Sequence, residues 1–176
     1  MPRPRASTDA SVTRILDAFR RLTRHLRQAD RQTEQRLGIS GAQLFTLEQL
    51  GQSPTQSVNE LAEMTRTHQS SVSVVVSRLV ERGLAARRQS DADGRRVELR
   101  ITSAGQALLR RSPATPQARL ISALERMPSA SLATLAELLD HMVEEMGAGG
   151  EQPAMFFEDA KPRVRPPRRQ RRRATS

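Results

Sequence analysis

Residues 57–102 read SVNELAEMTRTHQSSVSVVVSRLVERGLAARRQSDADGRRVELRIT. Apolar residues recur at helical spacing up to Gly83, and beyond it they alternate at every second position. Ser57 and Glu60 have the spacing of a capping box, which predicts a short helix that ends near Thr65. A second helix, expected over residues 69–82, carries one buried stripe, which consists of Val72, Val75, Val76 and Leu79.

The other side of the second helix is made mostly of small polar residues. With the residues at the two helix starts, the candidates for contact are Ser57, His68, Gln69, Ser70, Ser71, Ser73, Val74, Ser77 and Arg78. Serine is a mediocre helix former, so four serines on one short helix favour a contact surface over a neutral helix surface. A DNA major groove admits one such helix. We expect Arg78 to contact a phosphate or a guanine and Val74 to contact a thymine methyl. His68 is expected to contact a phosphate or to cap the helix.

Residues 84–88 and 97–101 are expected to form a β-hairpin. Leu84, Ala86 and Arg88 should alternate along the outgoing strand, and Val97, Leu99 and Ile101 along the returning strand. Asp and Gly between the strands mark a tight turn, so the tip carries Arg95 and Arg96 side by side. A helix-turn-helix followed by such a hairpin is a winged helix. Its tip is either a solvated turn or, as we favour, a pair of guanidinium groups that suits a narrow minor groove.

Several ordered motifs resemble the MarR family of bacterial transcriptional regulators. They are Leu61-Ala62-Glu63, the helix end from Arg78 to Leu84, the tip Asp93-Gly94-Arg95-Arg96 and the run from Leu99 to Gly105, within a similarity from about Thr8 to Gly147. The resemblance implies a homodimeric repressor or activator, with repression favoured, on pseudo-palindromic operators. It also implies that residues 69–82 read the major groove, and that Arg95, held by Asp93, enters the minor groove. Many relatives have Asp-Arg-Arg at the tip, so Arg96 stays an alternative to Arg95.

Charge and composition narrow the classes of partner. The formal net charge of +10 favours a polyanion such as DNA. Cysteine is absent, which excludes a disulfide framework and a thiolate metal site. His25, His68 and His141 have no metal-ligand spacing, and no catalytic signature is present, so we expect no metal, no cofactor and no enzyme activity. Without a long apolar run or a signal segment, we expect a cytoplasmic, nucleoid-associated protein with no membrane partner.

Two long helices should flank the winged-helix lobe of about residues 40–102. The first, over residues 8–37, carries Val12, Ile15, Leu16, Phe19, Leu22 and Leu26 on one stripe and would span roughly 45 Å. That is more than a small lobe needs, so we interpret it as half of a dimer interface; packing within one subunit is the alternative. A helix near residues 131–146 carries a second wide stripe, and with the rest of residues 103–147 it should complete a dimerisation bundle.

Shorter helices are expected around these elements. Ser40 and Gln43 predict a capped helix that ends at Gly51, and the following link could add a residue or two of strand against the wing. Ser103 and Gln106 have the same spacing and predict a helix to Arg111, and another is expected over residues 116–127.

The two ends of the chain are rich in basic residues. Residues 1–7 are predicted to be a mobile arm and residues 148–176 a disordered tail, with eight basic against three acidic residues. Phe156 and Phe157 are expected to dock onto the bundle. The arginines of the tail either contact DNA phosphates without sequence preference or stay solvated.

The leading functional hypothesis is a transcriptional regulator that responds to a small-molecule effector. Members of the family bind small aromatic or phenolic effectors between the dimer bundle and the DNA-binding lobe. By that resemblance the candidate pocket residues are Phe19, Leu22, Leu44 and Phe45, with plain core as the alternative. The competing hypotheses are a winged-helix protein-interaction module and a nonspecific nucleoid-associated protein, both without operator specificity.

Overall fold

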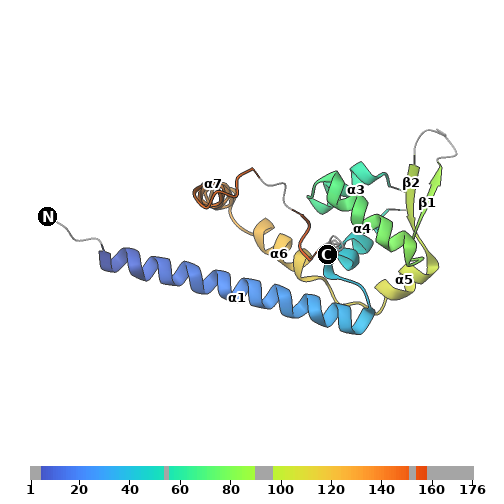
Figure 1. The fold of residues 1–176 in the computed structure, drawn as a ribbon, viewed down its shortest axis with the longest axis horizontal. Helices are drawn as coiled ribbons and strands as arrows, with labels where there is room; N and C mark the ends of the chain where they lie inside the picture. The colour runs from blue at the N-terminus through green and yellow to red at the C-terminus, as the bar shows by residue number, and fades with distance from the viewer. Residues whose placement is uncertain (1–4, 54–55, 90–96, 151–153, 158–176) are drawn as a thin grey trace, which may run out of the picture.

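The computed structural model describes residues 5–53, 56–89, 97–150 and 154–157. In chain order the elements are α1 (Arg5–Leu37), α2 (Gly41–Leu50), α3 (Val58–Thr65), α4 (Gln69–Glu81), β1 (Ala85–Gln89), β2 (Val97–Ile101), α5 (Ser103–Leu109), α6 (Pro116–Glu125) and α7 (Ser129–Glu145) (Figure 1). A mainly helical chain with one antiparallel hairpin is the predicted fold class, and the order of elements is that of a winged helix. The first helix begins at Arg5, earlier than the predicted start at residue 8.

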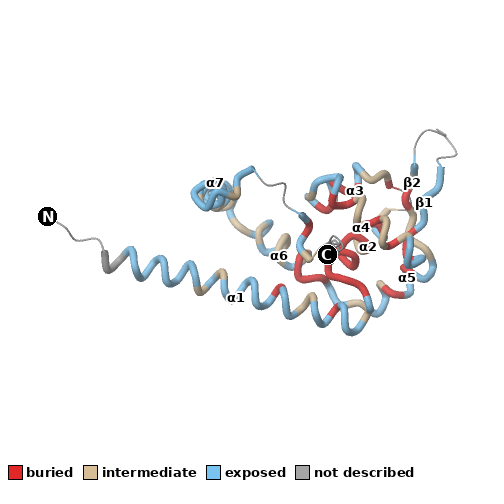
Figure 2. The backbone as a smooth tube through the Cα atoms, in the orientation of Figure 1, coloured by how far each residue is buried: buried red, intermediate tan, exposed pale blue. Residues whose placement is uncertain are grey.

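The hydrophobic core lies in the winged-helix lobe, where α2, α3, α4 and the base of the hairpin meet. Its fully buried side chains include Ile39, Leu44, Phe45, Leu47, Leu50, Leu61, Val72, Val75, Val76, Leu79 and Leu99. Figure 2 shows the buried segments gathered in this lobe, whereas most of α1 and α7 is exposed. The lobe is therefore the part of one chain that can be stable on its own contacts.

Local sequence signals determine where the two helices of the helix-turn-helix begin and end. The Oγ of Ser57 accepts a hydrogen bond from the backbone N–H of Glu60, and Glu60 accepts one from the backbone N–H of Ser57, as the capping box predicts. Gly83 has a φ of +69°, a left-handed conformation that glycine adopts without steric cost. The chain therefore leaves α4 at the predicted residue and turns directly into β1.

The hairpin has the predicted pairing but not the predicted alternation. Ala85 pairs with Ile101 and Gln89 with Val97 in an antiparallel register. Leu84 and Ala85 are both buried, residues 86–89 are all exposed, and Val97 is exposed as well. The expected alternation is therefore wrong for both strands away from their base. The reason is that the lobe covers only the base of the hairpin, so most of β1 has no layer to pack against.

The link before α3 adds a third short stretch of backbone to the wing. Gln56 exchanges two backbone hydrogen bonds with Leu99, of 3.1 Å and 2.6 Å. This bridge confirms the predicted residue of strand against the hairpin. It fixes β2 to the start of α3, so that the wing and the helix-turn-helix form one unit.

The helix after the wing starts from a different cap than predicted. Thr102, not Ser103, is the N-cap, because its extended backbone lets its Oγ1 accept a hydrogen bond from the N–H of Gly105 at 3.1 Å. The same hydroxyl donates to the carbonyl of Gly83 at 2.7 Å. The helix also ends at Leu109, short of the predicted Arg111. Thr102 thus joins α5 to the turn at the end of α4.

Helices α1 and α7 leave large apolar side chains in solvent. These are Val12, Ile15, Leu16 and Leu22 on α1, and Leu138, Val143 and Met146 on α7. In the described chain α7 has no buried residue at all. Figure 1 shows that α1 extends well beyond the winged-helix lobe and that α7 lies apart from the lobe. One copy of the chain therefore does not cover the two stripes that the sequence places on these helices.

The segment Ala154–Phe157 returns to the lobe, contrary to the predicted tail from residue 148. Met155 is buried in the core, and its Sδ lies 3.5 Å from the Oγ1 of Thr46 on α2. Phe156 is 51% exposed. Phe157 is half-buried, and its ring lies beside Gly41 at the start of α2. The prediction that both phenylalanines dock onto the bundle is therefore wrong: Phe156 stays largely in solvent, and Met155 and Phe157 contact the winged-helix lobe.

Candidate nucleic-acid interface

Helix α4 turns one side to the core and the other to solvent. His68, Gln69 and Ser70 at its start are exposed, and Ser73, Val74, Ser77 and Arg78 are half-buried along the outward side. The side chain of His68 makes no capping hydrogen bond, so the capping alternative for His68 is not what the structure shows. Without a side-chain cap, the first N–H groups of α4 stay open to an acceptor such as a phosphate, which the helix dipole also favours.

Ser71 does not lie on the outward side. It is only 8% exposed, on the same side of α4 as Val72 and Val75. Residues four apart lie on one face of a helix, so the phase that buries Val75 also buries Ser71. The prediction of Ser71 as a DNA-contacting hydroxyl is therefore corrected, and the outward serines are Ser70, Ser73 and Ser77.

Ser77 links the helix to the wing. Its Oγ donates to the carbonyl of Ser73 at 2.9 Å and accepts from the Nη2 of Arg87 on β1, also at 2.9 Å. The hydroxyl that we predicted to face DNA thus holds an arginine beside α4. Sequence reasoning missed Arg87, although two consecutive arginines on a strand already indicated that at least one of them faces solvent.

The other predicted DNA contacts are Ser57, at the start of α3, and Asp93, Arg95 and Arg96, which the sequence places between the two strands. The Oγ of Ser57 is half-buried and accepts from the N–H of Glu60, so its first task is to cap α3. Asp93, Arg95 and Arg96 lie outside the described residues. The last described pair of the hairpin is Gln89 with Val97.

The outward surface of α4 and β1 is basic. Arg78 on α4 and the exposed pair Arg87 and Arg88 on β1 lie on adjacent elements that contact each other. The first turn of α4 carries no acidic residue. Figure 1 shows the two strands beside α4. A polar helix flanked by arginines is the arrangement that places hydrogen-bonding groups in a groove and cations at the phosphates on its edges.

The four predicted effector-pocket residues do not come together. Leu44 and Phe45 are fully buried in the core of the lobe. Phe19 and Leu22 instead line an apolar cavity of about 570 Å³ between α1 and α7, whose other walls are Ile15, Ala18, Leu135, Leu138, Leu139 and Met142. A single pocket lined by all four is therefore ruled out, and Leu44 and Phe45 are plain core.

No group of three or more histidine, aspartate or glutamate side chains lies close enough to hold a metal ion within the ranges given above. Over the same ranges, no helix combines the length and the apolar character needed to cross a bilayer.

Known proteins resemble this chain in sequence motif and in fold. Residues 37–96 match the model of the MarR family. A MarR family transcriptional regulator from Streptomyces coelicolor, solved in complex with DNA, is 22% identical, with a TM-score of 0.53 over 81% of this chain and 95% of its own. A Bordetella bronchiseptica protein whose DNA binding is regulated by 6-hydroxynicotinic acid is 26% identical, with a TM-score of 0.50 over 73% and 91%. Comparison with curated protein sequences found no match.

The fold is that of the winged helix-turn-helix class. The sequence match covers α2, α3, α4 and β1, which are the elements that build the candidate interface. Within the lobe, residues 37–96 are similar to the MarR family of transcriptional regulators, as its motifs indicated.

Proposed function

We propose that this chain is a homodimeric transcriptional repressor that binds a pseudo-palindromic operator. The observation that carries the proposal is the outward side of α4, where Gln69, Ser70, Ser73 and Val74 are accessible while Arg78 and Arg87 flank them. Small polar side chains read base edges, and the flanking guanidinium groups bind phosphates. At the wing tip, Arg95, with Asp93 beside it, is the proposed minor-groove contact.

The proposed dimer rests on the apolar side chains of α1 and α7. Ile15 and Leu22 on α1 and Leu138 on α7 are each more than 40% exposed in a single chain. Large apolar stripes of this kind are stable only when another surface covers them. A second copy supplies two matching stripes, and a two-fold axis through the helices then presents two α4 helices to successive turns of one DNA face.

The proposed effector response has support from one relative. The Bordetella bronchiseptica protein, 26% identical to this chain, has its DNA binding regulated by 6-hydroxynicotinic acid. We propose that occupancy of a cavity in this chain likewise changes its affinity for the operator. A ligand achieves this only if it binds the DNA-competent and the incompetent conformations with different affinities.

Operator selection tests the proposal as a whole. The purified full chain is incubated with a random duplex library, and bound duplexes are recovered at rising salt. We expect a palindromic consensus that survives salt, because base contacts remain after phosphate contacts are screened. Light scattering should give the mass of two chains. Recovery of random duplexes only, or a monomeric mass, would contradict the proposal and favour a nonspecific or protein-binding role.

A further inference from the structure

We propose that the outer side of α1 binds the phosphate backbone of a second DNA duplex, so that the protein bridges two DNA segments. This side of the helix carries six arginines within residues 14–31, and all six are exposed. We name this set the arginine face; it consists of Arg14, Arg20, Arg21, Arg24, Arg27 and Arg31. The proposal goes beyond operator binding, because it concerns a surface that the recognition helix does not share.

The arginine face points away from the winged-helix lobe. Leu26 and Thr33 of α1 are buried. Asp30, which lies between them in sequence, accepts a hydrogen bond of 2.6 Å from the backbone N–H of Gly41 on α2. At 3.6 residues per turn, the arginine face lies on the opposite side of the helix from these residues. Figure 1 shows α1 along one edge of the molecule, with β1 and β2 near the opposite edge. A duplex on the arginine face is therefore not the duplex that lies against α4.

The charge of the arginine face is not neutralised within the described chain. Residues 14–31 contain two aspartates besides the six arginines. Asp17 lies 2.8 Å from Arg20 in an ion pair, and Arg20 is the one arginine of the face that pairs with a described residue. Arg20 and Arg24 are four residues apart, a spacing at which like charges destabilise a helix. A negatively charged partner relieves this repulsion.

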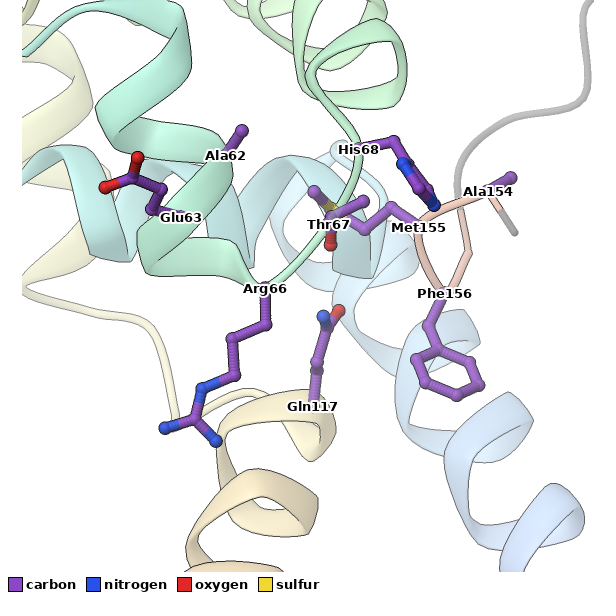
Figure 3. Close-up of a pocket in the computed structure, with 9 residues that line it drawn as sticks. All are labelled: Ala62, Glu63, Arg66, Thr67, His68, Gln117, Ala154, Met155 and Phe156. Carbon is purple, nitrogen blue, oxygen red and sulfur yellow. The ribbon is translucent and has the colours of Figure 1, made fainter. Parts of the chain in front are cut away.

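Arginines of the lobe are held differently. Figure 3 shows the side chain of Arg66 extending from the turn after α3 toward α6. There it lies 2.6 Å from Glu125 in an ion pair. Arg82, at the end of α4, donates a hydrogen bond to the carbonyl oxygen of Gly38. These arginines connect parts of the fold, whereas five of the six on the arginine face have no such partner among the described residues.

The composition of the arginine face favours a phosphate backbone over a protein surface. Protein interfaces draw their affinity from buried aromatic and aliphatic anchors. Within residues 14–31, the residues that share this side of the helix with the arginines are Asp17 and Gln28, and neither is apolar. A guanidinium group binds a phosphate through two parallel hydrogen bonds. The helix rises roughly 26 Å from the first arginine to the last, so the face reaches several phosphates of one duplex.

The proposed dimer leaves the arginine face open. Its interface consists of the apolar side chains of α1 and α7, and the apolar cavity lined by Phe19 and Leu22 shows that α7 lies on that side of α1. Two copies therefore present two arginine faces to solvent, while the two α4 helices bind the first duplex. One dimer then holds two DNA segments at once.

A bridging assay on the full chain tests the proposal. A random-sequence duplex is fixed to streptavidin beads, and a fluorescently labelled duplex of another sequence is added with the protein. We expect the protein to carry the labelled duplex onto the beads at about 50 mM salt and to release it at about 200 mM salt, because salt weakens phosphate contacts. The assay needs no operator, so a failure of operator recognition leaves it readable. No capture of the labelled duplex would overturn the proposal.

Two variants with an equal loss of charge locate the binding. The face variant combines Arg14→Gln, Arg21→Gln, Arg24→Gln and Arg31→Gln. The control variant changes four exposed arginines in or directly after α5 and α6, and it combines Arg110→Gln, Arg111→Gln, Arg119→Gln and Arg126→Gln. The face variant should capture at least about fivefold less labelled duplex, and the control variant should stay within about twofold of the parent chain. Equal losses would assign the effect to net charge and overturn the proposal.

Undiminished bridging in the face variant would also overturn the proposal, since it would mean that the two α4 helices of a dimer hold one duplex each. Glutamine is close to arginine in helix propensity, and circular dichroism and light scattering check that both variants fold and dimerise. The milder pair Arg21→Gln with Arg24→Gln should give an intermediate loss. The affinity for a single selected operator is measured separately and should be the same in the face and control variants.

A lipid surface is the other polyanion that a basic amphipathic helix fits. Sedimentation with vesicles of anionic phospholipid is therefore measured for the parent chain and the face variant. Vesicle binding that the face variant loses, together with no DNA bridging by the parent chain, would assign the arginine face to a membrane and overturn the proposal.

Discussion

Arg87 of β1 donates a hydrogen bond to the hydroxyl of Ser77 on α4 over 2.9 Å. The contact joins the wing to the recognition helix on the outward side of the lobe. Ser77→Ala should therefore weaken operator binding by about twofold to fivefold, since the hydroxyl that holds the guanidinium of Arg87 in place is lost. Arg87→Ala should weaken it at least as much. Fluorescence anisotropy with labelled operator measures both.

The double variant distinguishes positioning from direct contact. If Ser77 acts by holding Arg87, the combination Ser77→Ala with Arg87→Ala should bind no more weakly than Arg87→Ala alone. Additive losses would instead mean that the two side chains contact DNA independently.

At the wing tip, Arg95→Ala should weaken operator binding by more than about tenfold, because a guanidinium in a narrow minor groove is strongly attracted. A gel-shift titration measures this, and light scattering checks that the dimer persists. Arg126→Ala removes the same charge at the C-cap of α6 and should change little. Equal losses in both variants would assign the effect to net charge and reject the role of Arg95.

On the recognition helix, Val74→Ala should change base preference more than total affinity. Val74 is accessible on the outward side of α4, and a valine methyl discriminates thymine from other bases by apolar contact. Operator selection with the variant is the measurement. An identical consensus for the variant and the parent chain would count against the contact.

Gly105→Ala should destabilise the fold. A Cβ at this position would lie 2.2 Å from the carbonyl oxygen of Leu84, which is backbone at the base of the wing. Relief requires α5 to move away from the hairpin, so we expect a loss of about 2–4 kcal/mol in the free energy of unfolding. Gly150→Ala, where a Cβ meets no atom within 4 Å, is the control. Urea denaturation that gives equal stabilities for both variants would show that the contact relaxes freely.

Glu48 gives a pH dependence of stability. Burial raises the pKa of this carboxyl, and the hydrogen bonds from Thr115 only partly offset that increase. A carboxyl with a raised folded pKa binds more protons in the folded state, so its contribution to stability is full below the unfolded pKa and is lost as pH rises through the folded pKa. Glu48→Gln should therefore be more stable than the parent at pH 7, and this gain should shrink toward pH 4. Thermal melts across that range that keep a constant difference would exclude the titration of Glu48.

The parts of the fold that follow from local chemistry were predictable. Ser57 with Glu60 and the stop at Gly83 act within one or two turns of chain, so spacing alone located both ends of the helix-turn-helix. The position of Thr102 as the cap of α5 was missed because Ser103 offers the same chemistry one residue later. Only the backbone conformation distinguishes the two hydroxyls.

The site was predictable to the level of the helix but not of each side chain. Period 3.6 placed Ser73 and Val74 outward correctly, yet Ser71 sits at the edge of the apolar stripe, where sequence does not decide exposure. The link between Ser77 and Arg87 depends on how β1 returns beside α4, a tertiary relationship with no local signal. The burial of Gln117, whose Oε1 has no hydrogen-bond partner within the described chain, likewise depends on tertiary packing and has no local signal.

The anchoring of Met155 determines how the protein can be shortened. A truncation before residue 154, made to remove the arginine-rich end, also deletes a side chain that is 4% exposed in the core and leaves a void against Thr46. Such a fragment would be less stable, and a loss of DNA binding caused by that lower stability would be wrongly attributed to the missing arginines. Deletion variants that test the basic end should therefore stop after Phe157.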